Sequence, residues 1–146
     1  PDRERLAHAV QHHGLSHCVR FAGALNQAEV RAELTRADAF VLPSLAEGIP
    51  VVLMEAMASG VPCVTSPVNG IPELIDHGHN GLLALPGDAQ ALADQLRKLI
   101  ADAPLRQRLA LAGRAKVERA FHLADSVARL AAIFQSLPAV TARGLV

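Results

Sequence analysis

The sequence predicts an α/β protein in which helices cover both faces of a doubly wound parallel sheet. Short apolar segments alternate with helical segments through the first 85 residues, a pattern typical of parallel strands joined by helices. The apolar segments are continuous rather than alternating, as expected for strands that are buried on both faces. The links between segments are short, about two to six residues, which is usual in this class.

The first part of the chain is expected to hold two helices and two strands. Apolar spacing predicts a helix over residues 2–13 and a short strand over 18–22. Asn26 and Glu29 have the spacing of a capping box, which begins the second helix. The apolar run 39–42, closed by a proline, is expected to form the second strand.

The middle of the chain continues the alternation. Pro50 is expected to be the first residue of a helix that ends near Gly60, because proline is favoured at that position. Residues 61–65 are the next expected strand, with a proline at its start where a missing N–H does little harm. A last short strand is expected over 82–85.

The remainder of the chain has helical periodicity. Asp88 is the expected N-cap of the first of three helices, followed by helices over about 104–120 and 123–136. The tail, 138–146, has no periodicity and is expected to be frayed. We therefore expect one domain over residues 1–137.

Composition excludes several classes of function. The chain has 146 residues, with 14 basic and 14 acidic side chains, so charge gives no reason to expect a nucleic-acid partner. It has four Phe and neither Trp nor Tyr, which argues against an aromatic stacking platform. Its two cysteines, Cys18 and Cys63, suit a reducing compartment. No apolar run is long enough to span a bilayer and no signal peptide is recognised, so we expect a cytoplasmic protein.

The stretch 43–60 has the features of a ligand site. It places a strand end, a loop with a carboxylate and a helix start in succession, and ligands of open α/β sheets bind outside the carboxyl ends of strands. Free N–H groups and the positive helix end suit a phosphate. These N–H groups belong to Gly48, Ile49, Val51 and Val52, whereas Pro50 has no N–H and leaves one gap.

Two glutamates accompany this loop. Glu47 lies in the loop and Glu55 lies about one and a half turns inside the helix, so they would reach different parts of a ligand. A glutamate before a helix is also commonly a solvated residue that interacts with the helix dipole. Glu55, beside Leu53 and Met54, must be paired, hydrogen-bonded or placed at a cleft. On the residues alone, a structural and a binding role both stay open.

An ordered set of motifs resembles the C-terminal, donor-binding domain of retaining GT-B glycosyltransferases, most closely glycosyltransferase family 4, also called group 1. The resemblance covers roughly residues 4 to 135 and implies a Rossmann-like sheet. The matching motifs are Ala37–Ser44, Glu47 with Glu55 eight residues later, Gly60-Val61-Pro62, Gly70–Ile75, Asn80–Leu83 and Pro86-Gly87-Asp88.

The resemblance implies a role for each site residue. Glu47 would be the catalytic residue that contacts the donor sugar near its reacting carbon, without acting as a nucleophile. Glu55 would hold the ribose hydroxyls, and the backbone of Gly48, Ile49, Pro50 and Val51 would approach the sugar and the diphosphate. Asn69-Gly70 stands where the family often has Gly-Gly, which changes the backbone freedom of that loop.

The implied activity is hexosyl transfer from a nucleotide-diphosphate sugar to a glycan, lipid or small-molecule acceptor, with no metal and no cofactor. The resemblance also implies two further strands from a preceding part of the domain. In the sheet they would lie between the strands expected over 18–22 and 39–42, and their segment would supply an Arg and a Lys to the diphosphate. Neither residue is assignable, so we expect a fragment that is inactive without the N-terminal acceptor domain. The alternatives are a catalytically idle binding or interaction domain and, less favoured, a phosphorylase or epimerase.

Other candidate residues give weaker signals. His77 and His79 flank a glycine turn but have no third metal ligand. Ser44 has no triad partners, and the sequence contains neither G-x-S-x-G nor G-x-G-x-x-G. The basic residues of the helix over 104–120 are expected to form a solvated face, with peripheral contact to an anionic membrane as an alternative.

Overall fold

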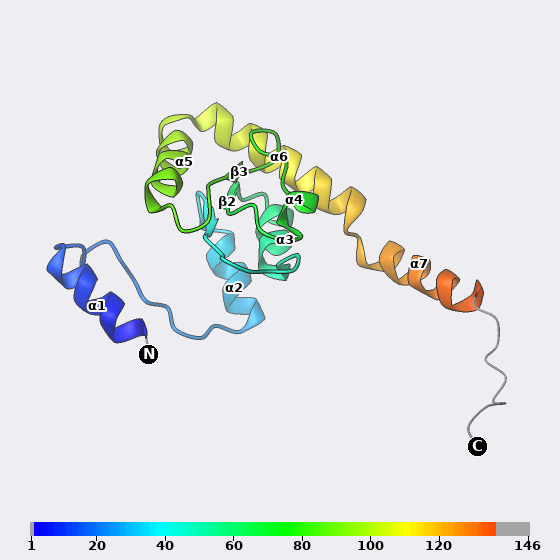
Figure 1. Ribbon diagram of the computed structural model, residues 1–146, viewed down its shortest axis with the longest axis horizontal. Helices are drawn as coiled ribbons and strands as arrows, with labels where there is room; N and C mark the ends of the chain where they lie inside the picture. Colours follow the sequence, from blue (N-terminus) through cyan, green and yellow to red (C-terminus); the bar gives the residue numbers. More distant parts are fainter. Residues whose placement is uncertain (1, 137–146) are drawn as a thin grey trace, which may run out of the picture. The chain divides into compact units, whose positions relative to one another are not determined.

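The computed structural model describes residues 2–136 (Figure 1). The chain divides into two compact units, of which the first ends at Val30 and the second begins at Arg31. The tail expected to be frayed, 138–146, lies outside the described residues. No helix of the described part is long and apolar enough to cross a membrane.

The first unit begins with α1 (Asp2–His12), whose side chains are all exposed or half-buried. The prediction of a strand over 18–22 is wrong, because the structure has no strand among the residues it describes before Phe40. The chain turns at the start of this segment, where the Val19 N–H donates to Leu15 O over 3.1 Å. A strand needs a neighbour to accept and donate its backbone hydrogen bonds, and no strand of the described residues lies beside this segment.

Helix α2 (Gln27–Leu34) begins with the predicted capping box. The Asn26 side-chain oxygen accepts from Glu29 N over 3.0 Å, and the Glu29 carboxylate accepts from Asn26 N over 2.7 Å. Two N–H groups of the first turn are therefore satisfied reciprocally.

The second unit contains a parallel sheet of three strands in the order β1-β2-β3, of which β2 and β3 are labelled in Figure 1. The strands are β1 (Phe40–Leu42), β2 (Cys63–Thr65) and β3 (Leu82–Leu83). Strand β3 is two residues shorter than the predicted strand over 82–85. Every residue of the central β2 is buried, as expected for a strand covered on both faces. Within the described residues, no strand pairs with the other edge of β1.

Helices connect the strands and complete the core. Helix α3 (Val51–Ala58) leads from β1 to β2, and α4 (Ile71–Leu74) leads from β2 to β3. Helices α5 (Ala89–Ala101), α6 (Ala103–Ala120) and α7 (Leu123–Ser136) follow. A core cluster joins the sheet to α5 and α6 through Val64, Leu82, Leu99 and Leu109.

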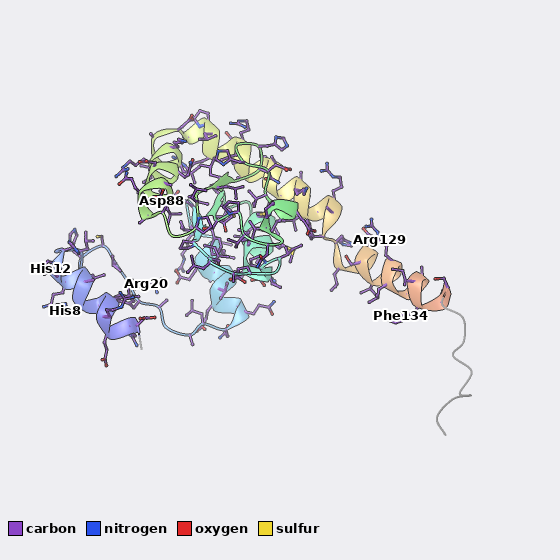
Figure 2. All side chains as sticks on the ribbon, viewed as in Figure 1. His8, His12, Arg20, Asp88, Arg129 and Phe134 are labelled. Carbon is purple, nitrogen blue, oxygen red and sulfur yellow. The ribbon has the colours of Figure 1, made fainter. Side chains whose placement is uncertain are left out.

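Polar side chains fix where the later helices begin. Asp88, labelled beside α5 in Figure 2, caps this helix as predicted. Its carboxylate accepts from Ala91 N over 2.8 Å. Asp102 caps α6 in the same way, accepting from Leu105 N over 2.8 Å. Helix α7 has no buried residue, and Phe134 on it is 66% exposed.

The turn before β3 is held by Asn80, which is 2% exposed. Its amide donates to Leu74 O over 3.0 Å and accepts from Asp76 N over 2.7 Å. His77 Nδ1 accepts from Leu83 N over 2.9 Å. These bonds fix the entry of the chain into β3.

Candidate functional site

Two loops meet at the carboxyl ends of β1 and β2. One is 43–50, which leads into α3, and the other is 66–70, which leads into α4. A Cβ placed on Gly70 would lie 2.7 Å from Ile49 Cγ1 and 2.9 Å from Gly48 O, so only glycine fits where the loops touch. Asn69 has φ 45°, in the left-handed region that asparagine tolerates better than most residues. Asn69-Gly70 thus meets both backbone requirements of this loop.

Helix α3 begins one residue later than predicted. Pro50 has φ −67° and ψ 126°, so it is the extended N-cap residue rather than the first helical residue. The proline ring fixes φ near the observed value, and its carbonyl still accepts from Leu53 N over 3.1 Å. No side chain caps the helix, and its first turn has no acidic residue. The nearest acidic residue before α3 is Glu47, three residues ahead of Pro50, so the first turn of α3 itself holds no carboxylate against its positive end.

The predicted N–H groups are free. Among residues 2–136, no hydrogen-bond acceptor pairs with the N–H of Gly48, Ile49, Val51 or Val52. Gly48 and Val51 are exposed, and Ile49 and Val52 are half-buried. Unsatisfied N–H groups at a helix N-terminus provide donors and a favourable field for an anion such as a phosphate.

Glu47 is half-buried and has a fixed partner. The Ser44 hydroxyl donates to Glu47 Oε1 over 3.0 Å, and Ser44 N in turn donates to Leu42 O at the end of β1. Sequence reasoning considered Ser44 only as a nucleophile and missed this role. The signal was its position, three residues before Glu47 in a loop. Ser44 orients the carboxylate, and the second oxygen of Glu47 stays available.

Glu55 is half-buried on α3, and its carboxylate has no hydrogen bond or ion pair within the described chain. The same helix buries Leu53 and Met57 in the core, while Met54 is half-buried. Leu53 therefore packs in the core rather than lining a pocket. An unpaired carboxylate on a mostly apolar helix needs a polar partner, and a ligand would supply one.

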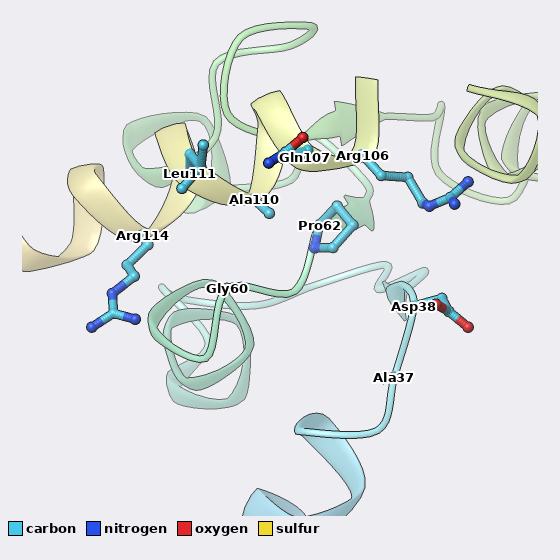
Figure 3. Close-up of a pocket in the computed structure, with 9 residues that line it drawn as sticks. All are labelled: Ala37, Asp38, Gly60, Pro62, Arg106, Gln107, Ala110, Leu111 and Arg114. Carbon is cyan, nitrogen blue, oxygen red and sulfur yellow. The ribbon is translucent and has the colours of Figure 1, made fainter. Parts of the chain in front are cut away.

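A pocket of ≈ 380 Å³ lies at the amino ends of β1 and β2, opposite the two loops described above (Figure 3). Its basic residues are engaged: Arg106 Nη1 donates to Ile100 O over 3.0 Å and also to Leu99 O, and Arg114 pairs with Glu118 over 2.7 Å. Arg108 also donates to a backbone carbonyl, that of Gly78. The face expected to be solvated is thus partly used in contacts within the chain.

The remaining reactive groups do not form a second site. Within the part of the chain that the structure describes, no three His, Cys, Asp or Glu side chains lie where they could hold a metal ion. Burial raises the pKa of the Cys63 thiol to about 12, so this group stays protonated inside β2. Cys18 is exposed and is not part of a strand.

Residues 1–116 match the family described as "Glycosyl transferases group 1". The chain belongs to this family. Group 1 membership and the α/β fold with a parallel sheet, both expected from the sequence, are therefore confirmed.

Two curated relatives carry the names of biosynthesis glycosyltransferases. The chain is 45% identical over 139 residues to the amylovoran biosynthesis glycosyltransferase AmsK of Erwinia amylovora, covering 91% of the chain and 34% of the relative. It is 38% identical over 148 residues to the putative colanic acid biosynthesis glycosyltransferase WcaL of Escherichia coli, covering 94% and 36%. The chain thus spans about a third of the length of the curated relatives it matches.

Solved structures superpose on this chain over about a third of their own length. Sucrose-phosphate synthase from Thermosynechococcus elongatus superposes with a TM-score of 0.85 at 29% identity, over 92% of this chain and 34% of that one. HepE from Anabaena, solved in complex with UDP, gives a TM-score of 0.85 at 29% identity, over 92% and 36%. Another structure of HepE contains UDP-glucose.

Proposed function

We propose that this chain is the donor-binding part of a retaining glycosyltransferase that transfers a hexose from a nucleotide-diphosphate sugar to an acceptor. The observation that carries the proposal is the set of free N–H groups at Gly48, Ile49, Val51 and Val52 beside the start of α3, which no side chain caps. HepE, a structural neighbour, was solved with UDP and with UDP-glucose, which supports this class of donor.

Each part of the site has one role in the proposal. The free N–H groups and the positive end of α3 bind the diphosphate and stabilise the negative charge that develops on this leaving group as its bond to the sugar breaks. Glu47, held by Ser44, accepts hydrogen bonds from sugar hydroxyls near the reacting carbon and favours positive charge there. Glu55 accepts from the ribose hydroxyls, which satisfies its otherwise unpaired carboxylate.

The rest of the enzyme is also part of the proposal. We assign binding of the acceptor mainly to the sequence that the relatives have beyond the third matched here, so the 146-residue chain has no turnover. It binds the donor weakly, because the Arg and the Lys expected at the diphosphate are not assignable in it. We place the enzyme in the cytoplasm, in keeping with two free cysteines. Membrane contact through α6 is left out, because Arg106 and Arg108 are engaged within the chain.

Calorimetric and NMR titrations of the 146-residue chain with UDP-, GDP- and ADP-glucose test this function. We expect one nucleotide class to bind and to shift the amide signals of Gly48 to Val52. Glu55→Gln should weaken binding by about tenfold, since a hydrogen bond to a charged group contributes roughly 1.5–3 kcal/mol. Glu118→Gln is the matched control, because Glu118 is exposed and pairs only with Arg114 on α6.

The same titrations distinguish the second candidate function. Donor affinity that Glu55→Gln leaves unchanged would contradict the role given to Glu55, and a folded chain that binds none of the three donors would contradict donor binding. That result would favour the catalytically idle binding domain, which keeps the fold without the chemistry.

A further inference from the structure

A pocket of ≈ 320 Å³ lies at the carboxyl ends of all three strands. Pro43 and Leu45 reach it from the segment after β1, Ser66 from the segment after β2, and Ala84 and Leu85 from the segment after β3. The first turn of α5 closes it. The strands therefore hold this pocket at the edge of the sheet where ligands of this fold class bind.

The wall of this pocket is mostly apolar. Leu45 and Leu85 line it and are nevertheless 74% and 67% exposed, so a ligand seated there would cover two leucines that water now surrounds. Burial of apolar surface is favourable by about 25 cal/mol per Å². Asp88 also lines the pocket, but its carboxylate caps α5 by accepting from Ala91 N. The pocket thus favours an apolar ligand over a sugar or a nucleotide.

Ser66 provides one polar contact. The residue is 2% exposed and lines the pocket, and its hydroxyl has no hydrogen-bond partner among residues 2–136. It is not sealed in the interior either, because no fully enclosed side-chain nitrogen or oxygen of the described chain lacks a partner. The small accessible part of the hydroxyl therefore faces the pocket, where a ligand oxygen would satisfy it.

We propose that this pocket binds the apolar, non-reacting part of the acceptor: an alkyl or acyl group linked to the acceptor sugar, with its linking oxygen at Ser66. The inference rests on the proposed function, because Pro43 and Leu45 of the pocket belong to the same loop after β1 as Glu47, the residue that the proposed function assigns to the donor sugar. It narrows the acceptor from a glycan, lipid or small molecule to a glycolipid-like molecule.

NMR titration of the 146-residue chain with n-hexyl β-D-glucoside tests the pocket, with free glucose as the control ligand. We expect the glucoside to shift the amide signals of Ser66, Ala84 and Leu92, and glucose to leave them unchanged. Leu85→Asp should weaken glucoside binding by about tenfold, because it places a charge at an apolar rim. Leu111→Asp is the matched control, since Leu111 is 65% exposed at the rim of the other pocket and should not change binding.

Ser66→Ala separates the hydrogen bond from the apolar contact. It should weaken glucoside binding by about threefold to tenfold, as expected for the loss of one hydrogen bond. The proposal would be overturned if Leu111→Asp weakened glucoside binding as much as Leu85→Asp does, or if the NMR shifts were confined to α7. Either result would indicate that the glucoside adsorbs to exposed apolar side chains as a detergent does. Because Leu85 is exposed, its variant keeps the test decisive if Ser66→Ala fails to fold.

Parallel titration with UDP-glucose, GDP-glucose and ADP-glucose keeps the two proposals apart. Donor shifts at Gly48 to Val52 without glucoside binding would refute the pocket and leave the proposed function standing. Glucoside binding with no donor binding would refute the proposed function and, with it, the assignment of the pocket to an acceptor.

Discussion

Replacing Gly70 by alanine tests the contact between the two loops of the site. The new Cβ would lie 2.7 Å from Ile49 Cγ1 and 2.9 Å from Gly48 O. Non-bonded carbons pack at about 3.5–4.0 Å, so the overlap with Ile49 is about 1 Å. Gly70 has φ −78°, which alanine adopts freely, so the effect is steric. Overpacking of this kind costs about 1–3 kcal/mol of unfolding free energy.

Urea unfolding followed by circular dichroism measures this cost. With a slope of about 2 kcal/mol per M, a loss of about 2 kcal/mol lowers the midpoint by about 1 M while the slope stays unchanged. Gly48→Ala is the matched control in the same site. Its Cβ would have no neighbour within 4 Å and its φ lies outside the left-handed region, so stability should stay equal or rise by about 0.4–1 kcal/mol.

A midpoint for Gly70→Ala equal to that of the unmodified chain would refute the close approach of the loops. The same would follow if Gly48→Ala and Gly70→Ala lowered the midpoint equally, since only one of them meets an obstruction. Ile49→Ala removes the nearer of the two contacts, so combining it with Gly70→Ala should recover part of the loss.

Three further predictions concern the core. Because the Cys63 thiol has a pKa of about 12 when folded and 9.0 as its ordinary value, the unfolded state loses this proton first. The free energy of unfolding should therefore fall as the pH rises above 9. Between pH 8 and pH 10, the unmodified chain should lose about 1.4 kcal/mol more of it than Cys63→Ala does, as measured by urea unfolding, and equal losses would contradict this. Asn80→Ala should cost about 2–4 kcal/mol, because it leaves two backbone groups without their partners, and an unchanged midpoint would exclude that role. Leu109→Ala should cost about 2–5 kcal/mol by thermal or urea unfolding, whereas Leu111→Ala on the same helix should change stability by less than about 0.5 kcal/mol, since the first is 0% and the second 65% exposed.

Local signals in the sequence predicted the elements that depend on neighbouring residues. The capping box at Asn26 and the N-cap at Asp88 were predicted from side chains within a few positions, and both form the expected hydrogen bonds. The run 39–42 contains β1, because a continuous apolar segment closed by proline suits a covered strand.

The same reasoning failed where a distant partner decides the outcome. Residues 18–22 have the composition of a strand, but composition cannot show whether a neighbouring strand is present to pair with them. Pro50 was placed one position too far into α3, because the proline φ suits both the N-cap and the first helical residue.

The candidate site was predicted in part. The free N–H groups and the two glutamates follow from a loop placed between a strand and a helix, and the structure has them there. The apolar pocket beside Ser66 could not be predicted, because its wall comes from segments after three different strands. Their meeting depends on strand order, which one sequence does not specify.

The order of the sheet has a consequence for how the chain is made. Each strand pairs with the strand that precedes it in sequence, Val41 with Val64 and Val64 with Leu82, so every strand added finds its neighbour already synthesised. Each pairing still has to wait for the helix between the two strands, and such non-local parallel pairing is intrinsically slow. The strands of the second unit can therefore pair in the order of their synthesis, from β1 to β3, but the sheet gains its core only when α5 and α6 bring Leu99 and Leu109 against Val64 and Leu82.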